Sequence, residues 1–389
     1  MNFNAKIESI MVKNNLPLSY IEISKSALVH NFKCIKKVVK SGTKIAAVVK
    51  ANAYGHGDKE VVKILAPLVD YFQVNSIDEL YNVRKISKKP VLLLGYVGKS
   101  DIANAIELGC ILTVFDFSHA LLINEIARKL GVKQKVHIAV DSHLGREGVM
   151  PADLEKFLLE AKKMQNIKID GVYSHFANIE DTNDFSHAQK QIDTYKNVVE
   201  TFKKFGYGKI HTHISATSGV LAYEKWNGVH PIVRIGIGLY GMWPSENLKK
   251  DWSKKFDLMP VMKWVTHVAQ VKTLPAGHSI GYGLTHITKS ETKIAVIPQG
   301  YSNGIPRSAS NKGEALINGK HAPILGRVAM NMFVVDITDI KGVKAGDEVV
   351  LLGKQGKGDI TAEELGNSTD TINYEVVTRV SPLIPRIIA

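Results

Sequence analysis

The chain contains only two cysteines in 389 residues, Cys34 and Cys110. They form neither a CxxC pair nor a spacing typical of metal ligands, so we expect two reduced core thiols and no metal site. Thiols of this kind are typical of a cytoplasmic protein. No apolar run is long enough to cross a bilayer, and Met1 to Asn15 lacks the apolar core of a signal peptide. The sequence therefore predicts a cytoplasmic protein without membrane segments.

Arginine is also scarce: the chain has 42 lysines but only eight arginines, and its formal net charge is +13. No basic run is longer than two residues and no aromatic side chains interleave a basic stripe, which argues against nucleic-acid binding. Where lysine is used almost everywhere, an arginine indicates a need for its rigid, permanently charged fork. Arg146 and Arg234 lie at expected strand ends beside glycines, where a ligand can approach.

The first two-thirds of the chain alternates apolar segments with stretches long enough for helices. The apolar segments are rich in Val, Ile and Leu, as buried parallel strands are. Eight βα units in about 200 residues predict a (β/α)₈ TIM barrel, with a doubly wound sheet as the competing architecture. The expected strands are 45–50, 71–75, 91–96, 111–115, 135–141, 169–175, 210–215 and 232–237.

The clearest expected helix covers residues 186–205, with an apolar stripe, a capping box from Ser186 to Gln189, and Gly206 as its stop. The remainder of the chain reads as strand and turn. Residues 262–274, 332–338 and 347–352 are expected strands, 317–320 is a hairpin signal, and 361–366 a helix. We therefore expect a barrel over residues 15–246 and a mostly β domain over 247–389, with residues 1–14 packing against the second domain.

Polar residues gather where the expected barrel strands end. A barrel enzyme carries its active site at the carboxyl ends of its strands, and phosphate is commonly held after strands seven and eight. Each residue alone has a structural explanation, such as a loop cap or a packing glycine, and their common position on one rim is what indicates a site. The rim residues are Lys50, Asp141, Arg146, His175, Ser215, Arg234, Gly236 and Ile237.

Lys50 stands in the run Val49-Lys50-Ala51-Asn52-Ala53-Tyr54-Gly55-His56-Gly57. An amine at the end of a buried strand is costly to keep charged, and a neutral amine can condense with a carbonyl. The run resembles the pyridoxal-phosphate attachment motif of alanine racemases. Further segments resemble that family in the same order, so that the resemblance extends over residues 18–386. Among them are Gly281-Tyr282-Gly283, Gly300-Tyr301-Ser302-Asn303-Gly304, Gly326-Arg327-Val328-Ala329-Met330 and Asn373-Tyr374-Glu375-Val376.

The resemblance implies a role for each matched position. Lys50 would hold pyridoxal 5'-phosphate covalently and act as one catalytic base, and Tyr282 would be the opposing base, supplied by the partner subunit of a homodimer. Arg234 would face the pyridine nitrogen, held by His175. Arg146 and the partner's Met330 would bind the substrate carboxylate, and Tyr301 would gate the site. The phosphate would be held by Tyr54, Ser215, Gly236, Ile237 and Tyr374.

The chain departs from the family pattern at three places. Ala139 stands where many members carry a carbamylated lysine, Asn331 where an aspartate is common, and Ser142-His143-Leu144 where Thr-Gly-Met is common. A partly buried guanidinium without a permanent partner is costly. Because neighbours in sequence often point apart, Glu147 is not the expected partner of Arg146. We expect instead a small anion such as chloride, or a neutral hydrogen-bonding side chain.

The resemblance implies a racemase that interconverts L-alanine and D-alanine for peptidoglycan by a two-base mechanism. Its substrate would be a small amino acid, bound at active sites shared across a homodimer. A racemase of the same fold acting on serine, lysine or several amino acids is the nearest alternative. A non-catalytic pyridoxal-phosphate carrier is a further alternative, but it would not need Tyr282 as a second base. A decarboxylase would need a protonated ring nitrogen, which Arg234 disfavours.

Overall fold

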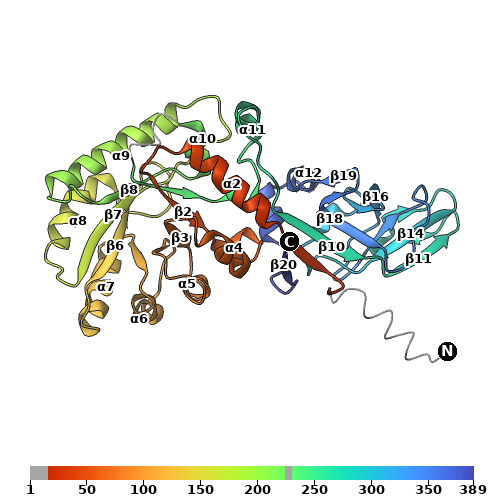
Figure 1. The fold of residues 1–389 in the computed structure, drawn as a ribbon, viewed down its shortest axis with the longest axis horizontal. Helices are drawn as coiled ribbons and strands as arrows, with labels where there is room; N and C mark the ends of the chain where they lie inside the picture. The colour runs from red at the N-terminus through yellow and green to blue at the C-terminus, as the bar shows by residue number, and fades with distance from the viewer. Residues whose placement is uncertain (1–15, 224–229) are drawn as a thin grey trace. The chain divides into compact units, whose positions relative to one another are not determined.

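The computed structural model describes residues 16–223 and 230–389 and divides into two compact units (Figure 1). The barrel unit runs from Lys25 to Met259. The C-terminal unit combines the described residues up to Ser24 with Pro260–Ala389. Helix α11 (Glu246–Trp252) belongs to the barrel unit, so this division falls after the boundary expected at residue 246. The expectation for residues 1–14 lies outside the described residues.

Eight parallel strands form the barrel in the order β8-β7-β6-β5-β4-β3-β2-β9. The amide of Arg234 donates a 3.0 Å hydrogen bond to the carbonyl of Ser215 and thereby links β9 to the end of β8. The predicted TIM barrel is thus confirmed. The strands are β2 (Lys44–Val48), β3 (Tyr71–Val74), β4 (Val91–Leu93), β5 (Ile111–Val114), β6 (Gln134–Ala139), β7 (Ile167–Tyr173), β8 (His211–His213) and β9 (Ile232–Ile235).

Each barrel strand ends one to three residues earlier than expected, because the chain turns into a site loop there. The helices of the unit lie outside the strands, as Figure 1 shows. Besides α11 they are α2 (Lys25–Val38), α4 (Asp58–Leu65), α5 (Ile77–Arg84), α6 (Lys99–Glu107), α7 (Phe117–Lys129), α8 (Leu154–Ala161), α9 (Ser186–Lys204) and α10 (Thr217–Ala222), with short 3₁₀ turns at Pro151–Asp153 and Ile237–Tyr240.

Helix α9 is present, but the expected capping box is wrong. Its N-cap is Phe185, which has no polar side chain to accept a hydrogen bond. Ser186 is already helical, and its amide donates to the carboxylate of Asp184 at 2.9 Å. Gln189 donates its side-chain amide to Asp193 one turn later, at 3.0 Å. The capping spacing was therefore present without the capping geometry.

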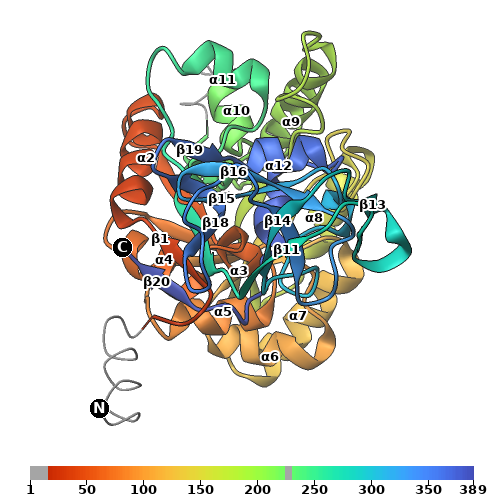
Figure 2. The same cartoon turned by 90° about the vertical axis from the view of Figure 1, so that its right-hand side faces the viewer.

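The C-terminal unit is mostly β, as predicted. Its main sheet has the order β11-β14-β17-β16-β15-β18-β10-β1-β20, with β19 paired to β18, and Figure 2 shows these strands from a second direction. The unit also contains a two-stranded sheet of β12 (Ser279–Ile280) and β13 (His286–Ile287) and two short helices, α12 (Ala362–Ser368) and α13 (Asn373–Thr378). The strands are β1 (Tyr20–Ile23), β10 (Met262–His267), β11 (Gln270–Leu274), β14 (Thr292–Ile297), β15 (Glu314–Ile317), β16 (Lys320–Leu325), β17 (Phe333–Asp336), β18 (Glu348–Gln355), β19 (Gly358–Ile360) and β20 (Arg386–Ile388).

The predicted hairpin at 317–320 is confirmed. Ile317 pairs with Lys320, and both turn residues have positive φ: 53° at Asn318 and 72° at Gly319. Such a turn matches the twist of the strands that it joins. Strand β1 was not expected. It lies between β10 and β20 and so fixes the start of the chain's described part to the C-terminal sheet.

Cys34 and Cys110 are buried free thiols, as expected. No described helix is both long and apolar enough to cross a membrane.

Candidate active site

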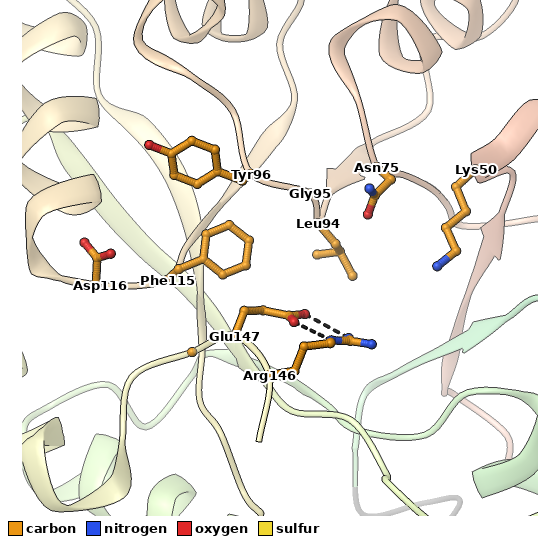
Figure 3. A pocket seen from close by; sticks show the side chains of 10 residues that line it. Lys50, Asn75, Leu94, Gly95, Tyr96, Phe115, Asp116, Arg146 and Glu147 are labelled. Carbon is orange, nitrogen blue, oxygen red and sulfur yellow. Dashed lines mark hydrogen bonds and ion pairs between the residues drawn. The ribbon is translucent and has the colours of Figure 1, made fainter. Parts of the chain in front are cut away.

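A cavity of about 690 Å³ opens at the carboxyl ends of the barrel strands (Figure 3). The loops after β2 to β6 supply its lining. The Lys50 side chain points into it, and so do the side chains of Arg146 and Glu147. The other lining residues are Asn75, Leu94, Gly95, Tyr96, Phe115, Asp116 and Gly148.

Lys50 is two residues beyond β2. Burial lowers the pKa of its amine, and the nearby positive charges of Arg146 and Arg234 lower it further. The carboxylates of Glu79 and Glu147 act in the opposite direction. The net effect favours the neutral amine, which is the form that attacks a carbonyl or accepts a proton.

The backbone after Lys50 is left-handed at four successive residues that are not glycine. Ala51, Asn52, Ala53 and Tyr54 have φ values of 54°, 53°, 52° and 54°. Left-handed backbone costs an L-residue roughly 1–2 kcal/mol, so it persists only where other contacts enforce it.

Glu79 supplies such contacts to the left-handed turn. Its Oε1 accepts from the amide of Ala51 at 2.6 Å, and its Oε2 accepts from the amides of Asn75 at 2.7 Å and Ser76 at 3.2 Å. Glu79 also belongs to the capping box of α5. One carboxylate thus fastens the Lys50 turn to the start of a neighbouring helix.

Arg234 and His175 lie together under the rim, as their predicted pairing requires. Arg234 is 3% exposed, and its Nη2 donates to the carbonyls of Ser174 at 2.7 Å and Ile214 at 2.9 Å. The same nitrogen lies 3.3 Å from Nδ1 of His175. Burial, aided by nearby positive charges, lowers the pKa of His175 to about 3, so the ring is neutral. Because an arginine can only donate, Nδ1 is the acceptor and the ring proton is on Nε2.

Tyr54 and Gly236 also come together, although 182 positions separate them. A Cβ atom added to Gly236 would lie 2.5 Å from the Tyr54 hydroxyl, so a side chain there would displace that hydroxyl. Burial raises the pKa of Tyr54 to about 12, which keeps its hydroxyl a proton donor. Ser215 and Ile237 are buried in the adjoining strand ends. These residues form a compact group at the end of the barrel where phosphates are commonly bound.

Arg146 contradicts the expectation that it lacks a permanent charged partner. Its Nε and Nη2 donate to Oε2 and Oε1 of Glu147, the second bond at 2.9 Å, in a two-bond pair drawn in Figure 3. Glu147 raises the pKa of the guanidinium through this hydrogen bonding. The permanent charged partner of Arg146 is therefore the adjacent carboxylate of Glu147.

The loop geometry explains why the two neighbours meet. Gly145 and Gly148, on either side of the pair, have φ values of 73° and 128°. A Cβ at Gly148 would lie 2.8 Å from the amide nitrogen of Asp141, so the loop closes tightly on its own start. In an extended strand, adjacent side chains point to opposite faces; this turn cancels that alternation.

Four matched residues belong to the C-terminal unit. Tyr282 lies in a turn between Gly281 and Gly283, whose φ values are 73° and 72°, and it is 71% exposed. Met330 and Tyr301 are also exposed, and Tyr374 is partly buried at the start of α13. Tyr301 and Met330 are close in the fold, because the amide of Ser302 donates to the Met330 carbonyl at 3.0 Å.

Comparison with known proteins assigns both units. A sequence profile for the alanine racemase N-terminal domain matches residues 23–244, and one for the C-terminal domain matches residues 261–388. The chain belongs to the alanine racemase family. It is 38% identical to alanine racemase 2 of Caldanaerobacter subterraneus subsp. tengcongensis over 370 residues, which are 94% of each protein.

Solved structures of the family have the same fold. Alanine racemase of Clostridium difficile 630 superposes with a TM-score of 0.89 at 32% identity, covering 97% of both chains. Alanine racemase of Bartonella henselae, solved with covalently bound pyridoxal phosphate, superposes with a TM-score of 0.82 at 26% identity, covering 96% of this chain and all of the other.

Sequence reasoning missed two carboxylates of this racemase fold. Glu79 follows Ser76 at capping-box spacing, a signal that predicts its helix role but not its bond to the Lys50 turn. Glu147 adjoins Arg146 in the sequence, where an extended backbone would point the two side chains apart. The glycines at 145 and 148 were the available signal that the chain turns there and brings neighbouring side chains together.

Proposed function

We propose that this chain interconverts L-alanine and D-alanine with pyridoxal 5'-phosphate, using Lys50 and Tyr282 as bases on opposite faces of the substrate. The observation that carries the proposal is the Lys50 amine, which projects into a cavity at the barrel rim with its pKa lowered by burial. Membership of the alanine racemase family supports the choice of reaction. The D-alanine would serve peptidoglycan synthesis in the cytoplasm.

The residues of the barrel rim fit pyridoxal phosphate. The Tyr54 hydroxyl, kept protonated by burial, lies against Gly236, where a side chain would displace it. Tyr54, Ser215, Gly236 and Ile237 would hold the phosphate, joined by Tyr374. Arg234 would face the ring nitrogen, and as a permanent cation it would disfavour protonation there. When bound, the cofactor supplies an electron sink for the pair left behind as the α-proton departs.

Lys50 would hold the cofactor and move a proton at its Nζ. Its lowered pKa makes the amine more readily available as a base than an ordinary lysine. The hydrogen bond from the Ala51 amide to Glu79 fixes the turn that begins directly after Lys50. The amine therefore projects from a rigid backbone. Arg146 would bind the substrate carboxylate with the donors that Glu147 does not use.

Tyr282 would hold or accept the proton on the other face. Racemisation removes a proton from one side of the α-carbon and returns one on the other, so one base on each side suffices with little motion. The glycines that flank Tyr282 leave its hydroxyl open to approach. We propose that the partner subunit of a homodimer receives it, together with Met330 at the substrate carboxylate and Tyr301 at the entrance.

A substrate panel tests the proposal. The purified protein, supplied with pyridoxal phosphate, is offered L-alanine, L-serine and L-lysine separately, and the D-enantiomer is measured by chiral chromatography. We expect D-alanine to form fastest and a visible band of lysine-bound cofactor that Lys50→Ala removes. Faster turnover of serine or lysine would assign the chain to another specificity, and the band without racemisation of any substrate would favour a carrier.

A further inference from the structure

Arg146 is held by a partner that sits inside the cavity rather than behind it. Glu147 lines the same cavity as Lys50 and Arg146, and in the view of Figure 3 the guanidinium lies between the carboxylate and the amine. The Arg146 side chain is 59% exposed, whereas that of Glu147 is 33% exposed. A long, exposed arginine has many rotamers, so a fixed direction requires a contact that selects one.

The Glu147 carboxylate makes that contact through both oxygens. Two parallel bonds, from Nε and Nη2, fix the plane of the guanidinium as well as its position. A guanidinium has five N–H donors, so three are left for another acceptor. Within the described residues, both hydrogen bonds of this side chain go to Glu147.

The backbone beneath the pair is immobilised by its own hydrogen bonds. Asp141 accepts from the amides of Leu144 at 2.7 Å and Gly145 at 2.9 Å. At the other end of the loop, the amide of Val149 donates to the Ala139 carbonyl at 2.9 Å. The loop therefore carries Glu147 at a fixed place, and the carboxylate can in turn fix Arg146.

Glu147 also sets part of the charge beside Lys50. The charged groups that act on the amine are Arg146 and Arg234, which lower its pKa, and Glu79 and Glu147, which raise it. Asp141 and the Tyr173 phenol act on Arg146 from the neighbouring strand ends. Without Glu147, Glu79 would be the one carboxylate left among the groups that act on the Lys50 amine, facing the positive charges of Arg146 and Arg234.

We propose that Glu147 is a positioning residue of the reaction, which aims the Arg146 guanidinium at the substrate carboxylate and balances its charge beside Lys50. This inference rests on the proposed racemase function. On this proposal Glu147 alone fixes the direction of the Arg146 guanidinium, without a modified side chain or a bound ion.

The test removes the negative charge of Glu147 and keeps the size and shape of its side chain. Glu147→Gln should raise KM for alanine about threefold to fivefold and leave kcat within about twofold, as the loss of a partly exposed pair predicts. The acidic limb of the kcat–pH profile should also move to lower pH, because removing a negative charge lowers the pKa of the Lys50 amine further. Glu155→Gln, an exposed carboxylate on α8, is the matched control and should change neither quantity.

A double-mutant cycle shows whether Glu147 acts through Arg146. In an Arg146→Lys background, Glu147→Gln should have little further effect on KM, because lysine lacks the planar fork. An equal effect in both backgrounds would overturn the proposal. So would a folded Glu147→Gln enzyme with the KM and pH profile of the wild type. If that variant does not fold, Glu147→Asp decides, since a shorter carboxylate should raise KM and leave the acidic limb in place.

Failure of the inference and failure of the proposed function are distinguishable. A wild-type protein that does not racemise alanine refutes the function itself. A wild-type protein that racemises alanine while Glu147→Gln behaves identically refutes only the role of Glu147.

Discussion

The barrel site and the Tyr282 turn are built in opposite ways. Around Lys50 several polar side chains are buried or paired. Arg234 is almost inaccessible and contacts two carbonyls and His175, and Glu79 accepts a hydrogen bond from the turn that follows Lys50. Tyr282 is an exposed tyrosine between two glycines in left-handed conformation.

The difference shows which half of the proposed site is complete within one chain. The barrel half has its geometry fixed by hydrogen bonds among its own residues. An exposed tyrosine has neither a fixed rotamer nor a dry environment, and both are needed for efficient proton transfer. We infer that a second chain supplies what the Tyr282 turn lacks.

The largest expected effect comes from removing Lys50, the proposed base of the barrel site. Lys50→Ala should lower racemisation by about four orders of magnitude or more and abolish the visible band of the lysine-bound cofactor. Absorbance spectra and chiral product analysis measure the two effects. Lys59→Ala, which removes an exposed lysine of α4, is the control and should leave both intact.

Tyr282→Phe should have a smaller and one-sided effect. It removes the hydroxyl and keeps the ring, so exchange of the α-proton should fall by about 10²–10⁴ for one enantiomer and much less for the other. Deuterium incorporation into L-alanine and D-alanine, measured separately, tests this. Equal exchange of both at the wild-type rate would make Tyr282 a structural residue.

The two units should also differ in their response to acid. In the barrel core, Nδ1 of His137 lies 2.8 Å from Nε2 of His213, and burial lowers the pKa of His137 to about 3 and that of His230 to about 4. As the pH falls, these histidines take up protons more readily in the unfolded chain than in the folded one. Their contribution to the stability of the folded barrel is therefore fully present above pH 6.5 and is lost as the pH falls toward 4. The four described histidines of the C-terminal unit are not buried.

We therefore expect the barrel to lose of the order of a few kcal/mol of stability between pH 7 and pH 4. Amide hydrogen exchange, resolved by peptide, should show faster opening of β6 to β8 than of β14 to β18 as the pH is lowered, after correction for intrinsic exchange rates. Equal acid sensitivity in both units would mean that the buried histidines of the barrel are not the cause of its loss of stability. His321→Gln, at an exposed position, is the control.

The smallest expected effect is an absence of response to ions. Since Glu147 is the partner of Arg146, turnover at constant ionic strength should differ by less than about twofold between chloride and sulfate, and bicarbonate should not change it. Initial rates in the three salts measure this. A specific chloride requirement would mean that Glu147 does not satisfy Arg146 in solution.

The architecture was predictable because it depends on patterns that repeat. Eight Val-, Ile- and Leu-rich segments at regular spacing indicate parallel strands, and the Asn318-Gly319 pair indicates a hairpin from two residues alone. Strand β1 was missed because four residues, Tyr20 to Ile23, carry too little periodicity. Its pairing with β10 and β20 depends on residues at least 239 positions away.

The details of the site were less predictable, because they depend on backbone conformations that sequence barely encodes. In Ala51-Asn52-Ala53-Tyr54 only Asn52 is of a type that adopts left-handed backbone readily. Contacts from Glu79 and the surrounding fold must select that conformation for the other three. The pairing of Arg146 with Glu147 depends likewise on the turn between Gly145 and Gly148. Strand-end positions predicted which residues meet at the rim, whereas the direction of each side chain required the structure.

Mixing two inactive variants tests most directly the claim that two chains share each site. Lys50→Ala and Tyr282→Phe subunits are unfolded together and refolded in equal amounts. Random pairing makes half of the dimers mixed, and each mixed dimer has one intact site, so about a quarter of wild-type activity should return. Each variant refolded alone is the control and should stay inactive. Activity no higher than the mean of the two controls would contradict the account, because Lys50 and Tyr282 would then act within one chain.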